Sequence, residues 1–178
     1  MNLESRKSGL TRHWLMLLPA IIILALLSYR LLVVRRADAK GGKIDVSALH
    51  LQSLDGTPLP VSRYQGKAIV LNFWAPWCPP CRVEIPWLQK IQLENKDAIV
   101  IGVVADPSQY SKAQAFMDSQ RVTYTLVQSS PSIEKLVGPI QGLPTTFYVS
   151  AKGNIVHTVT GLVSSGTMSS YVKDALRN

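Results

Sequence analysis

The sequence predicts an α/β domain in which helices cover both faces of a mixed β-sheet, with a transmembrane helix before the domain. Two apolar runs, residues 68–75 and 98–105, have the composition and length of strands that are buried on both faces. Segments with helical spacing alternate with strands, and this order favours a layered α/β sheet. A further apolar segment, residues 14–34, is long enough to cross a bilayer, since a spanning helix needs about 20 residues.

The elements of the domain follow from the same patterns. After the first buried run, Val83, Trp87, Leu88 and Ile91 repeat at helical spacing and predict a helix over 83–92. The other expected elements are a strand at 49–54 with a turn at Asp55-Gly56, a loop at 61–66, a helix at 111–120, a strand at 122–127, one or two helical turns at 132–137, a hairpin of strands 145–150 and 155–160 around the turn 151–154, and a closing helix at 165–176.

We interpret residues 14–34 as an uncleaved membrane anchor. Trp14 and Tyr29 lie where interfacial aromatic residues are expected, and Arg30 can extend its charge to the interface. A cleaved signal peptide is the alternative, because Ala37-Asp38-Ala39 resembles a cleavage site, and a buried helix of the domain is a third reading. Basic residues before that site favour the anchor. The expected organisation is a cytoplasmic tail and anchor at 1–36, a linker at 37–43 and a folded domain at 44–178.

Positive charge is concentrated near the N-terminus. The formal net charge is +8, and residues 1–40 hold seven Lys and Arg against two acidic residues. A basic flank suits an anionic membrane surface, whereas the remainder shows no basic stripe with interleaved aromatic residues, so nucleic-acid binding is not predicted. More basic residues follow the apolar segment than precede it, which taken literally places the domain in the cytoplasm. We expect the opposite side, because the two cysteines, Cys78 and Cys81, lie three positions apart, and this spacing is typical of redox pairs, which suit an oxidising compartment.

The chemistry is predicted to reside in the only two cysteines, Cys78 and Cys81. A disulfide scaffold needs more cysteines, a zinc site needs about four ligands, and no histidine lies at ligand spacing from the pair. Cys78 follows a predicted strand and begins a predicted helix, where free N–H groups and the helix dipole lower the pKa of a thiol. Cys81 follows one turn later on the same face, so its sulfur can resolve a mixed disulfide on Cys78. Pro79 and Pro80 fit the first helical turn.

The stretch Asn72-Phe73-Trp74-Ala75-Pro76-Trp77-Cys78-Pro79-Pro80-Cys81 resembles the active-site segment of the thioredoxin superfamily. It is most similar to the membrane-anchored bacterial group of TlpA, ResA and CcmG (DsbE) proteins. Gly142-Leu143-Pro144-Thr145-Thr146-Phe147 resembles the loop with the cis-proline, and Lys152-Gly153-Asn154-Ile155-Val156, followed by Gly161, resembles the next hairpin and its exit. The resemblance covers roughly residues 44–177. It implies a thioredoxin fold and dithiol–disulfide exchange on the periplasmic side of the bacterial cytoplasmic membrane, with a single-pass anchor.

Three residues are expected to carry the catalysis. Cys78 and Cys81 form the redox pair, and Glu84, three positions after Cys81, resembles a glutamate that acts near the thiols in the ResA-like branch. If Glu84 is buried, its pKa rises and it can move protons to or from Cys81; the plainer reading is a solvated helix glutamate. Asn72 stands where thioredoxin itself carries a buried acid, which strengthens the case for Glu84.

Three further residues are expected to bind substrate. The resemblance implies a cis bond between Leu143 and Pro144, which would expose backbone groups with which a substrate segment can pair as an added strand. Trp77 is expected to cover the active site. An ordinary turn proline and a core or surface tryptophan are the plainer readings. No metal site and no cofactor are predicted.

Several functions fit a protein with this cysteine pair. The first is a reductant of secreted proteins, such as apocytochrome c during cytochrome c maturation, that receives electrons from a membrane donor of the DsbD or CcdA type. The second is an oxidant of folding proteins, which runs the same chemistry in reverse. The third is a non-catalytic module that binds Cu(I) through two thiolates, although no Met or His lies near the pair in sequence. A peroxidase is disfavoured, because such an enzyme requires an arginine and a threonine around a single peroxidatic cysteine, and this sequence lacks that pattern.

Overall fold

The structure, a computed structural model, describes residues 21–25 and 42–178. Residues 21–25 are helical, with exposed side chains. No helix within these described residues is long and apolar enough to cross a membrane. The rest of the predicted anchor at 14–34, the possible cleavage site at 37–39 and most of the predicted linker lie outside the described residues, so the predicted division of the chain stays a prediction.

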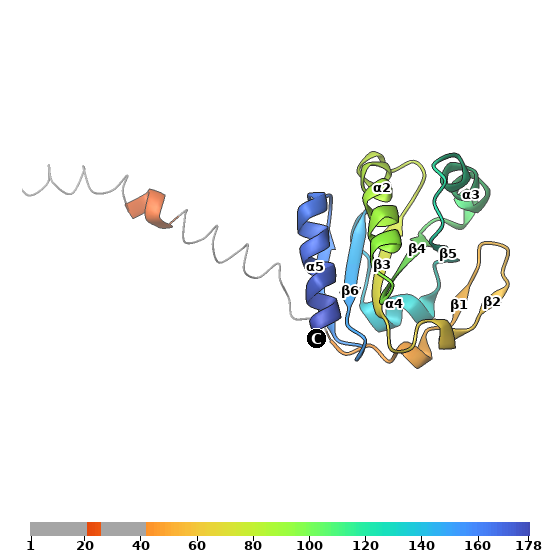
Figure 1. Cartoon of the computed structure of the whole chain (residues 1–178). Helices are drawn as coiled ribbons and strands as arrows, with labels where there is room; N and C mark the ends of the chain where they lie inside the picture. The colour runs from red at the N-terminus through yellow and green to blue at the C-terminus, as the bar shows by residue number, and fades with distance from the viewer. Residues whose placement is uncertain (1–20, 26–41) are drawn as a thin grey trace, which may run out of the picture. The chain divides into compact units, whose positions relative to one another are not determined.

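A mixed sheet forms the centre of the domain. Within the described residues it has five strands in the order β5-β4-β3-β6-β7. The central strand β3, Ala68–Trp74, runs parallel to β4, Ala98–Val104, which runs parallel to β5, Thr125–Gln128. On the other side β6, Thr145–Val149, is antiparallel to both β3 and β7, Ile155–Thr160. The mixed sheet predicted from the sequence is therefore confirmed (Figure 1).

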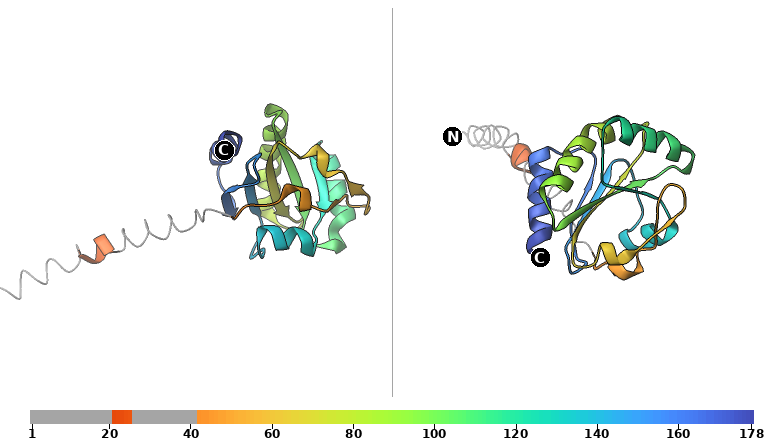
Figure 2. Two further views of the ribbon diagram at one scale, coloured as in Figure 1. Left: turned by 90° about the horizontal axis from the view of Figure 1, so that it is seen from below. Right: turned by 45° about the vertical axis from the view of Figure 1, so that its right-hand side comes forward.

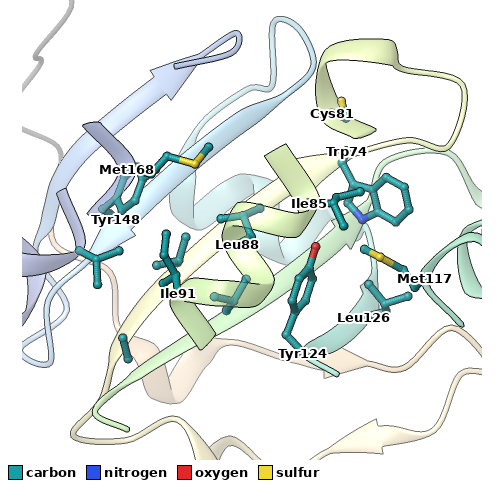
Figure 3. Packing of buried hydrophobic residues seen from close by; sticks show 14 of the residues in the cluster. Trp74, Cys81, Ile85, Leu88, Ile91, Met117, Tyr124, Leu126, Tyr148 and Met168 are labelled. Atoms are coloured by element: carbon teal, nitrogen blue, oxygen red, sulfur yellow. The ribbon is translucent and has the colours of Figure 1, made fainter. Parts of the chain in front are cut away.

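Helices cover both faces of this sheet (Figure 2). A hydrophobic core lies on each face of the sheet, and successive side chains of β3 point to opposite faces. Val70 and Trp74 therefore pack in the first core, and Leu71 and Phe73 pack in the second. The first core, part of which Figure 3 shows, includes residues of three helices, and the second includes residues of the shorter helix α4. These helices are α2 (Pro79–Glu94), α3 (Tyr110–Ser119) and α5 (Ser165–Arg177) on the first face, and α4 (Pro131–Val137) on the second.

Most predicted elements lie within one residue of their expected bounds, but α2 and β5 differ by more. α2 begins at Pro79, as the predicted helix start at Cys78 with Pro79 and Pro80 in the first turn requires, and it extends four residues before and two residues after the periodic segment 83–92. β5 begins at Thr125 and not at 122. The N–H of Val122 donates to the carbonyl of Met117 at 3.0 Å in the turn that ends α3, so it is not available to the sheet.

The start of the domain forms a short hairpin that the sequence predicted only in part. β1, Leu51–Gln52, pairs with β2, Pro58–Leu59, so the strand expected at 49–54 is shorter and has an unexpected partner. Proline lacks an N–H group, and this weakened the strand signal of β2. The turn at Asp55-Gly56 is present, and Asp55 accepts a hydrogen bond from the N–H of Thr57 at 2.9 Å. Short 3-10 helices complete the described domain: η1 (Val46–Ala48), η2 (Val61–Arg63) within the expected loop, and η3 (Pro107–Gln109).

The first described residues of the domain pair with the turn between β6 and β7. Ile44 donates its N–H to the carbonyl of Gly153 at 2.7 Å, and Lys43 forms an isolated bridge with Asn154. Gly153 has a φ of +84°, and a Cβ at this position would lie 2.2 Å from the carbonyl oxygen of Ile44. The glycine is therefore required both by its backbone conformation and by the close approach of the N-terminal segment.

We predict that Gly153→Ala lowers the free energy of unfolding more than Gly66→Ala does. Gly66 has a φ of +71°, and its added Cβ would meet no described atom within 4 Å, so this control should lose about 1 kcal/mol through backbone strain alone. Gly153→Ala should lose at least about 1 kcal/mol more, because the carbonyl of Ile44 must move. Urea denaturation measures both losses, and equal losses would contradict the close approach.

Candidate active site

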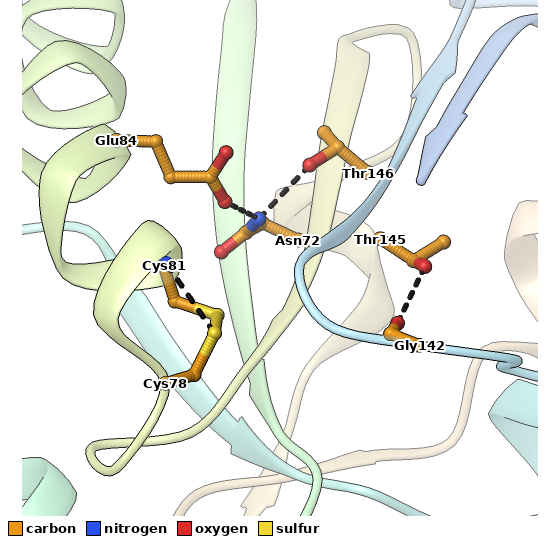
Figure 4. The surroundings of a disulfide bond; sticks show 7 residues. All are labelled: Asn72, Cys78, Cys81, Glu84, Gly142, Thr145 and Thr146. Carbon is orange, nitrogen blue, oxygen red and sulfur yellow. Dashed lines mark hydrogen bonds between the residues drawn. A yellow bond between two sulfur atoms is a disulfide. The ribbon is translucent and has the colours of Figure 1, made fainter. Parts of the chain in front are cut away.

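The cysteine pair lies where the central strand passes into a helix. β3 ends at Trp74, and Cys78 is the N-cap residue of α2. A disulfide joins Cys78 to Cys81, whose Cα atoms are 5.3 Å apart (Figure 4). The structure thus describes the oxidised protein, and opening this bond takes up two electrons and two protons. The predicted placement of the pair at a strand–helix junction is confirmed.

The two sulfur atoms have different surroundings. Sγ of Cys78 accepts the backbone N–H of Cys81 at 3.3 Å. Cys78 retains an exposed fraction of 4%, whereas Cys81 has none. When the disulfide is open, the N-terminal end of the helix favours a thiolate on Cys78, and burial favours a neutral thiol on Cys81. This asymmetry suits Cys78 as the attacking sulfur and Cys81 as the resolving one, which are the roles that the sequence predicts.

Glu84 lies on the buried face of α2, as Cys81 does. Its Oε1 accepts a hydrogen bond from Nδ2 of Asn72 at 2.6 Å. The same nitrogen of Asn72 donates to Oγ1 of Thr146 at 2.9 Å, and Figure 4 shows this chain of side chains beside the disulfide. The register places Asn72 directly opposite Thr146, so a residue of the neighbouring strand orients the amide that holds the carboxyl of Glu84. The alternative reading of Glu84 as a solvated helix residue is therefore wrong.

Burial changes the acidity of Glu84. It raises the pKa of the carboxyl to about 7, and the hydrogen bond from Asn72 opposes this rise only in part. In the part of the chain that the structure describes, the second oxygen, Oε2, has no hydrogen-bond partner. A carboxyl that titrates near neutral pH can accept a proton from a thiol and return it, so the site can carry out proton transfer as well as disulfide exchange. The expected raised pKa is present, and the catalytic role of Glu84 stays a prediction.

The loop before β6 brings the predicted proline to the same end of the sheet as the cysteines. The bond between Leu143 and Pro144 is cis, as the resemblance implied. The register pairs Phe73 with Thr145, so Pro144 lies where β3 leaves the sheet toward the cysteines. Leu143 is partly buried and packs against the core that contains both cysteines. This loop lies at the same end of the sheet as the redox pair, and the binding roles of Leu143 and Pro144 stay predictions.

Trp77 lies at the surface beside the redox pair. Its exposed fraction is 60%, whereas Trp74 is fully buried in the core. Trp77 also contributes to lowering the pKa of Asp106, after the larger effect of a hydrogen bond from Ser108. Because most of its side chain is exposed, Trp77 presents its ring to solvent next to Cys78, and this position suits contact with another protein. Its predicted cover of the active site stays a prediction.

The sequence did not predict three residues near Glu84. Thr146 had a weak signal, because it is a polar residue within an apolar strand, as Asn72 is. Tyr124 and Tyr148 are buried, and burial followed by the charge of Glu84 raises the pKa of each hydroxyl. No sequence pattern indicated them, since Tyr148 lies on β6 and Tyr124 directly precedes β5, and their approach to Glu84 depends on how these separate segments pack against α2.

Known proteins resemble this chain over most of its length. Residues 39–176 match the Redoxin family. The chain is 30% identical over 156 residues to the thiol-disulfide oxidoreductase ResA of Halalkalibacterium halodurans, covering 84% of this chain and 87% of the relative. It is 28% identical over 125 residues to ResA of Oceanobacillus iheyensis, covering 69% of this chain and 65%, just under two thirds, of the relative.

A solved structure extends these similarities to the fold. It is a thiol:disulfide interchange protein from Chlorobium tepidum, named DsbE, with 26% sequence identity and a TM-score of 0.65. The match covers 77% of this chain and 97% of that chain. Together with the mixed sheet and the cysteine pair at its strand–helix junction, it confirms the thioredoxin fold that the sequence predicted.

We predict that the oxidised protein becomes less stable as the pH rises from about 5 to about 8. The pKa of Glu84 is about 7 in the folded protein and has an ordinary value of 4.5. Between these values the folded protein holds a proton that the unfolded chain has lost, so stability is highest at the acidic end and falls as the pH rises. The loss should be on the order of 3 kcal/mol, measured by urea denaturation.

Glu84→Gln is the matched control for this measurement, because it keeps the shape of the side chain and removes its ionisation. The disulfide stays closed throughout, so the cysteines do not titrate. The difference in stability between the two proteins should change steadily over this pH range. A constant difference would mean that the carboxyl of Glu84 is not protonated at neutral pH in the folded protein.

Proposed function

The chain belongs to the Redoxin family and is a thiol–disulfide oxidoreductase, and on that premise we propose that it acts as a reductant of protein disulfides outside the cytoplasm. The observation that carries this direction is the burial of Glu84 on the helix face that also carries Cys81. An oxidant of folding proteins would use the same two cysteines, so the two directions differ in how well the reduced pair is stabilised.

The surroundings of the pair disfavour a strongly stabilised thiolate. Strong oxidants of this type hold a thiolate of unusually low pKa, which stabilises their reduced form. A carboxylate at Glu84 raises the free energy of a nearby thiolate, and burial does the same at Cys81. The neighbouring cation, Arg82, lies over the ring of Phe116, with its guanidinium carbon 4.9 Å from the ring centroid. The N–H of Cys81 favours the thiolate on Cys78. The carboxylate of Glu84 and the burial of Cys81 act against a thiolate, so together these effects support a stable disulfide and a reducing pair.

The proposed cycle transfers two electrons and two protons. The thiolate of Cys78 attacks a substrate disulfide, forms a mixed disulfide and releases one substrate thiolate, which takes a proton. Cys81 then gives its proton to Glu84 and attacks Sγ of Cys78, which re-forms the Cys78–Cys81 disulfide and releases the second substrate thiolate. Glu84 returns its proton as that thiolate leaves. A donor dithiol then reduces the pair by the same exchange in reverse.

We assign the substrates to exported proteins with cysteine pairs, for example apocytochrome c during cytochrome c maturation. The resemblance of the cysteine stretch to the ResA and CcmG group supports this class, and it also suggests a membrane donor of the DsbD or CcdA type. Trp77 and the cis bond between Leu143 and Pro144 are the proposed contacts. An extended substrate segment can pair with the backbone of the loop while an apolar side chain packs on Trp77.

We propose that residues 14–34 anchor the protein in the bacterial cytoplasmic membrane, with residues 44–178 on its periplasmic side. The apolar length of the segment, its basic flanks and its terminal aromatic residues support an anchor. Oxidising conditions outside the cytoplasm support the location, because a reductant has disulfides to reduce there. Residues 37–43 would then be the linker between anchor and domain.

We predict that the reduction potential of the Cys78–Cys81 pair lies well below about −180 mV, the value typical of protein disulfide isomerase. Equilibration in glutathione buffers, followed by alkylation of free thiols, measures it. Glu84→Gln should raise the potential, because a neutral amide no longer opposes the thiolate. A wild-type value near about −120 mV, typical of the oxidant DsbA, would contradict the proposed direction.

Cys81→Ala should hold its substrate as a mixed disulfide on Cys78, since the resolving thiol is absent. In bacterial cells it should capture exported cysteine-containing proteins, identified by mass spectrometry after non-reducing electrophoresis. Cys78→Ala, which lacks the nucleophile, is the matched control and should capture none. Capture of cytoplasmic proteins alone would contradict the proposed side of the membrane. A reactive Cys78 that captures nothing would count against the substrate class.

A further inference from the structure

A glycine beside Asn72 makes room for aromatic side chains near Glu84. The parallel register places Gly102 of β4 directly beside Asn72 of β3. A Cβ on Gly102 would lie 3.0 Å from Cε2 of Tyr124 and 3.2 Å from Nε1 of Trp74. Both rings therefore occupy the space that a side chain at position 102 would fill. Since neighbouring strands are about 4.8 Å apart, the edge of the Tyr124 ring lies next to the side chain that holds Glu84.

The hydroxyl of Tyr124 is at this edge of the ring. Cε2 is bonded to the ring carbon that carries the hydroxyl, and Figure 3 shows the hydroxyl pointing toward Ile85, the neighbour of Glu84 on α2. Tyr124 has an exposed fraction of 6%, and its hydroxyl has no hydrogen-bond partner among the described residues. Within the same residues, Oε2 of Glu84 has none either. An unpaired donor and an unpaired acceptor thus lie in one buried cluster.

The charge of Glu84 also acts on the hydroxyl of Tyr124. After burial, the charge of Glu84 is the cause that raises the pKa of Tyr124. Leaving a buried donor and a buried charged acceptor unpaired is unfavourable. The hydroxyl hydrogen of a tyrosine can rotate about its C–O bond toward any oxygen beside it, so a small approach of the carboxyl and the ring would complete a hydrogen bond between the two oxygens that are unpaired among the described residues.

We propose that Tyr124 is a positioning residue for Glu84, and that its hydroxyl donates a hydrogen bond to Oε2 of the ionised carboxylate. The ionised form is the one that accepts the proton of Cys81, so this inference deepens the proposed function and rests on it for its catalytic meaning. Asn72 then holds one carboxyl oxygen and Tyr124 the other. The two contacts fix the orientation of Glu84 on α2 and favour its ionised form against the effect of burial.

Few other titratable groups face Glu84 in the described structure. α2 contributes Cys81, β3 contributes the neutral Asn72, and β6 contributes Tyr148, whose hydroxyl is also buried and without a partner among the described residues. The charge of Glu84 also contributes to raising the pKa of Tyr148, after burial. The ring of Tyr148 packs against Tyr171 of α5, with 5.3 Å between ring centroids. Tyr148 is therefore a matched control: a buried, unpaired tyrosine on the other side of Asn72.

The test is the pKa of Glu84 in the oxidised protein, measured by carbon NMR of its side-chain carboxyl. Tyr124→Phe should raise this pKa by about one unit, which lowers the ionised fraction about tenfold at acidic to neutral pH. Tyr148→Phe removes a hydroxyl of similar burial and should shift the pKa by much less. An unchanged pKa in Tyr124→Phe, or an equal shift in the two variants, would overturn the assignment to Tyr124.

A second readout separates this inference from the proposed function. The rate of thiol alkylation in the reduced protein should depend on pH through Glu84, and Tyr124→Phe should move that profile to higher pH by about one unit. Glu84→Gln should remove the dependence. A profile that Glu84→Gln leaves unchanged would overturn the proton-transfer role of Glu84. A profile that changes in Glu84→Gln but not in Tyr124→Phe would overturn only the role of Tyr124.

Discussion

The hydrogen bond between Asn72 and Glu84 is the contact on which the rest of the site depends. It joins the central strand to the helix that carries both cysteines, over 2.6 Å and without access to water. A carboxyl is seldom buried unless it is neutral or hydrogen-bonded, so this single contact makes the position of Glu84 tolerable while burial keeps its pKa near 7. Without Asn72 the carboxyl would have no described partner, and α2 would hold an unpaired acid over the sheet.

The sheet creates this contact through its register. Asn72 lies between Gly102 on β4 and Thr146 on β6. One neighbour leaves space for aromatic rings, and the other supplies an oxygen that accepts from the same amide nitrogen. The strand that carries Asn72 then continues into the N-cap at Cys78, so the redox pair and the proton site share one rigid support. A site on paired strands and a helix start holds its geometry better than one on a free loop.

The parts of this site that could be predicted are those encoded within short stretches of sequence. The apolar runs around Val70 and Val100 indicated buried strands, and the spacing of Cys78 and Cys81 indicated a redox pair on one helix face. Thr146, Gly102 and Tyr124 could not be predicted, because each acts through a neighbour that only strand register or packing supplies. The strand β2, and so its pairing with β1, was missed for a different reason: β2 has only two residues, too few to show a period, and one of them is a proline.

Disulfide exchange and proton transfer are physically inseparable in such a site. When the disulfide opens, two thiols join the carboxyl of Glu84 in one region of low dielectric, and groups this close titrate as a coupled set. A thiolate on Cys78 disfavours ionisation of Glu84, and an ionised Glu84 disfavours a thiolate on Cys81. Each electron pair that enters therefore brings protons with it, and a carboxyl that titrates near neutral pH can supply or accept one of them. The burial that makes the folded domain less stable as the pH rises toward neutral is thus the same burial that keeps a proton within reach of the resolving sulfur.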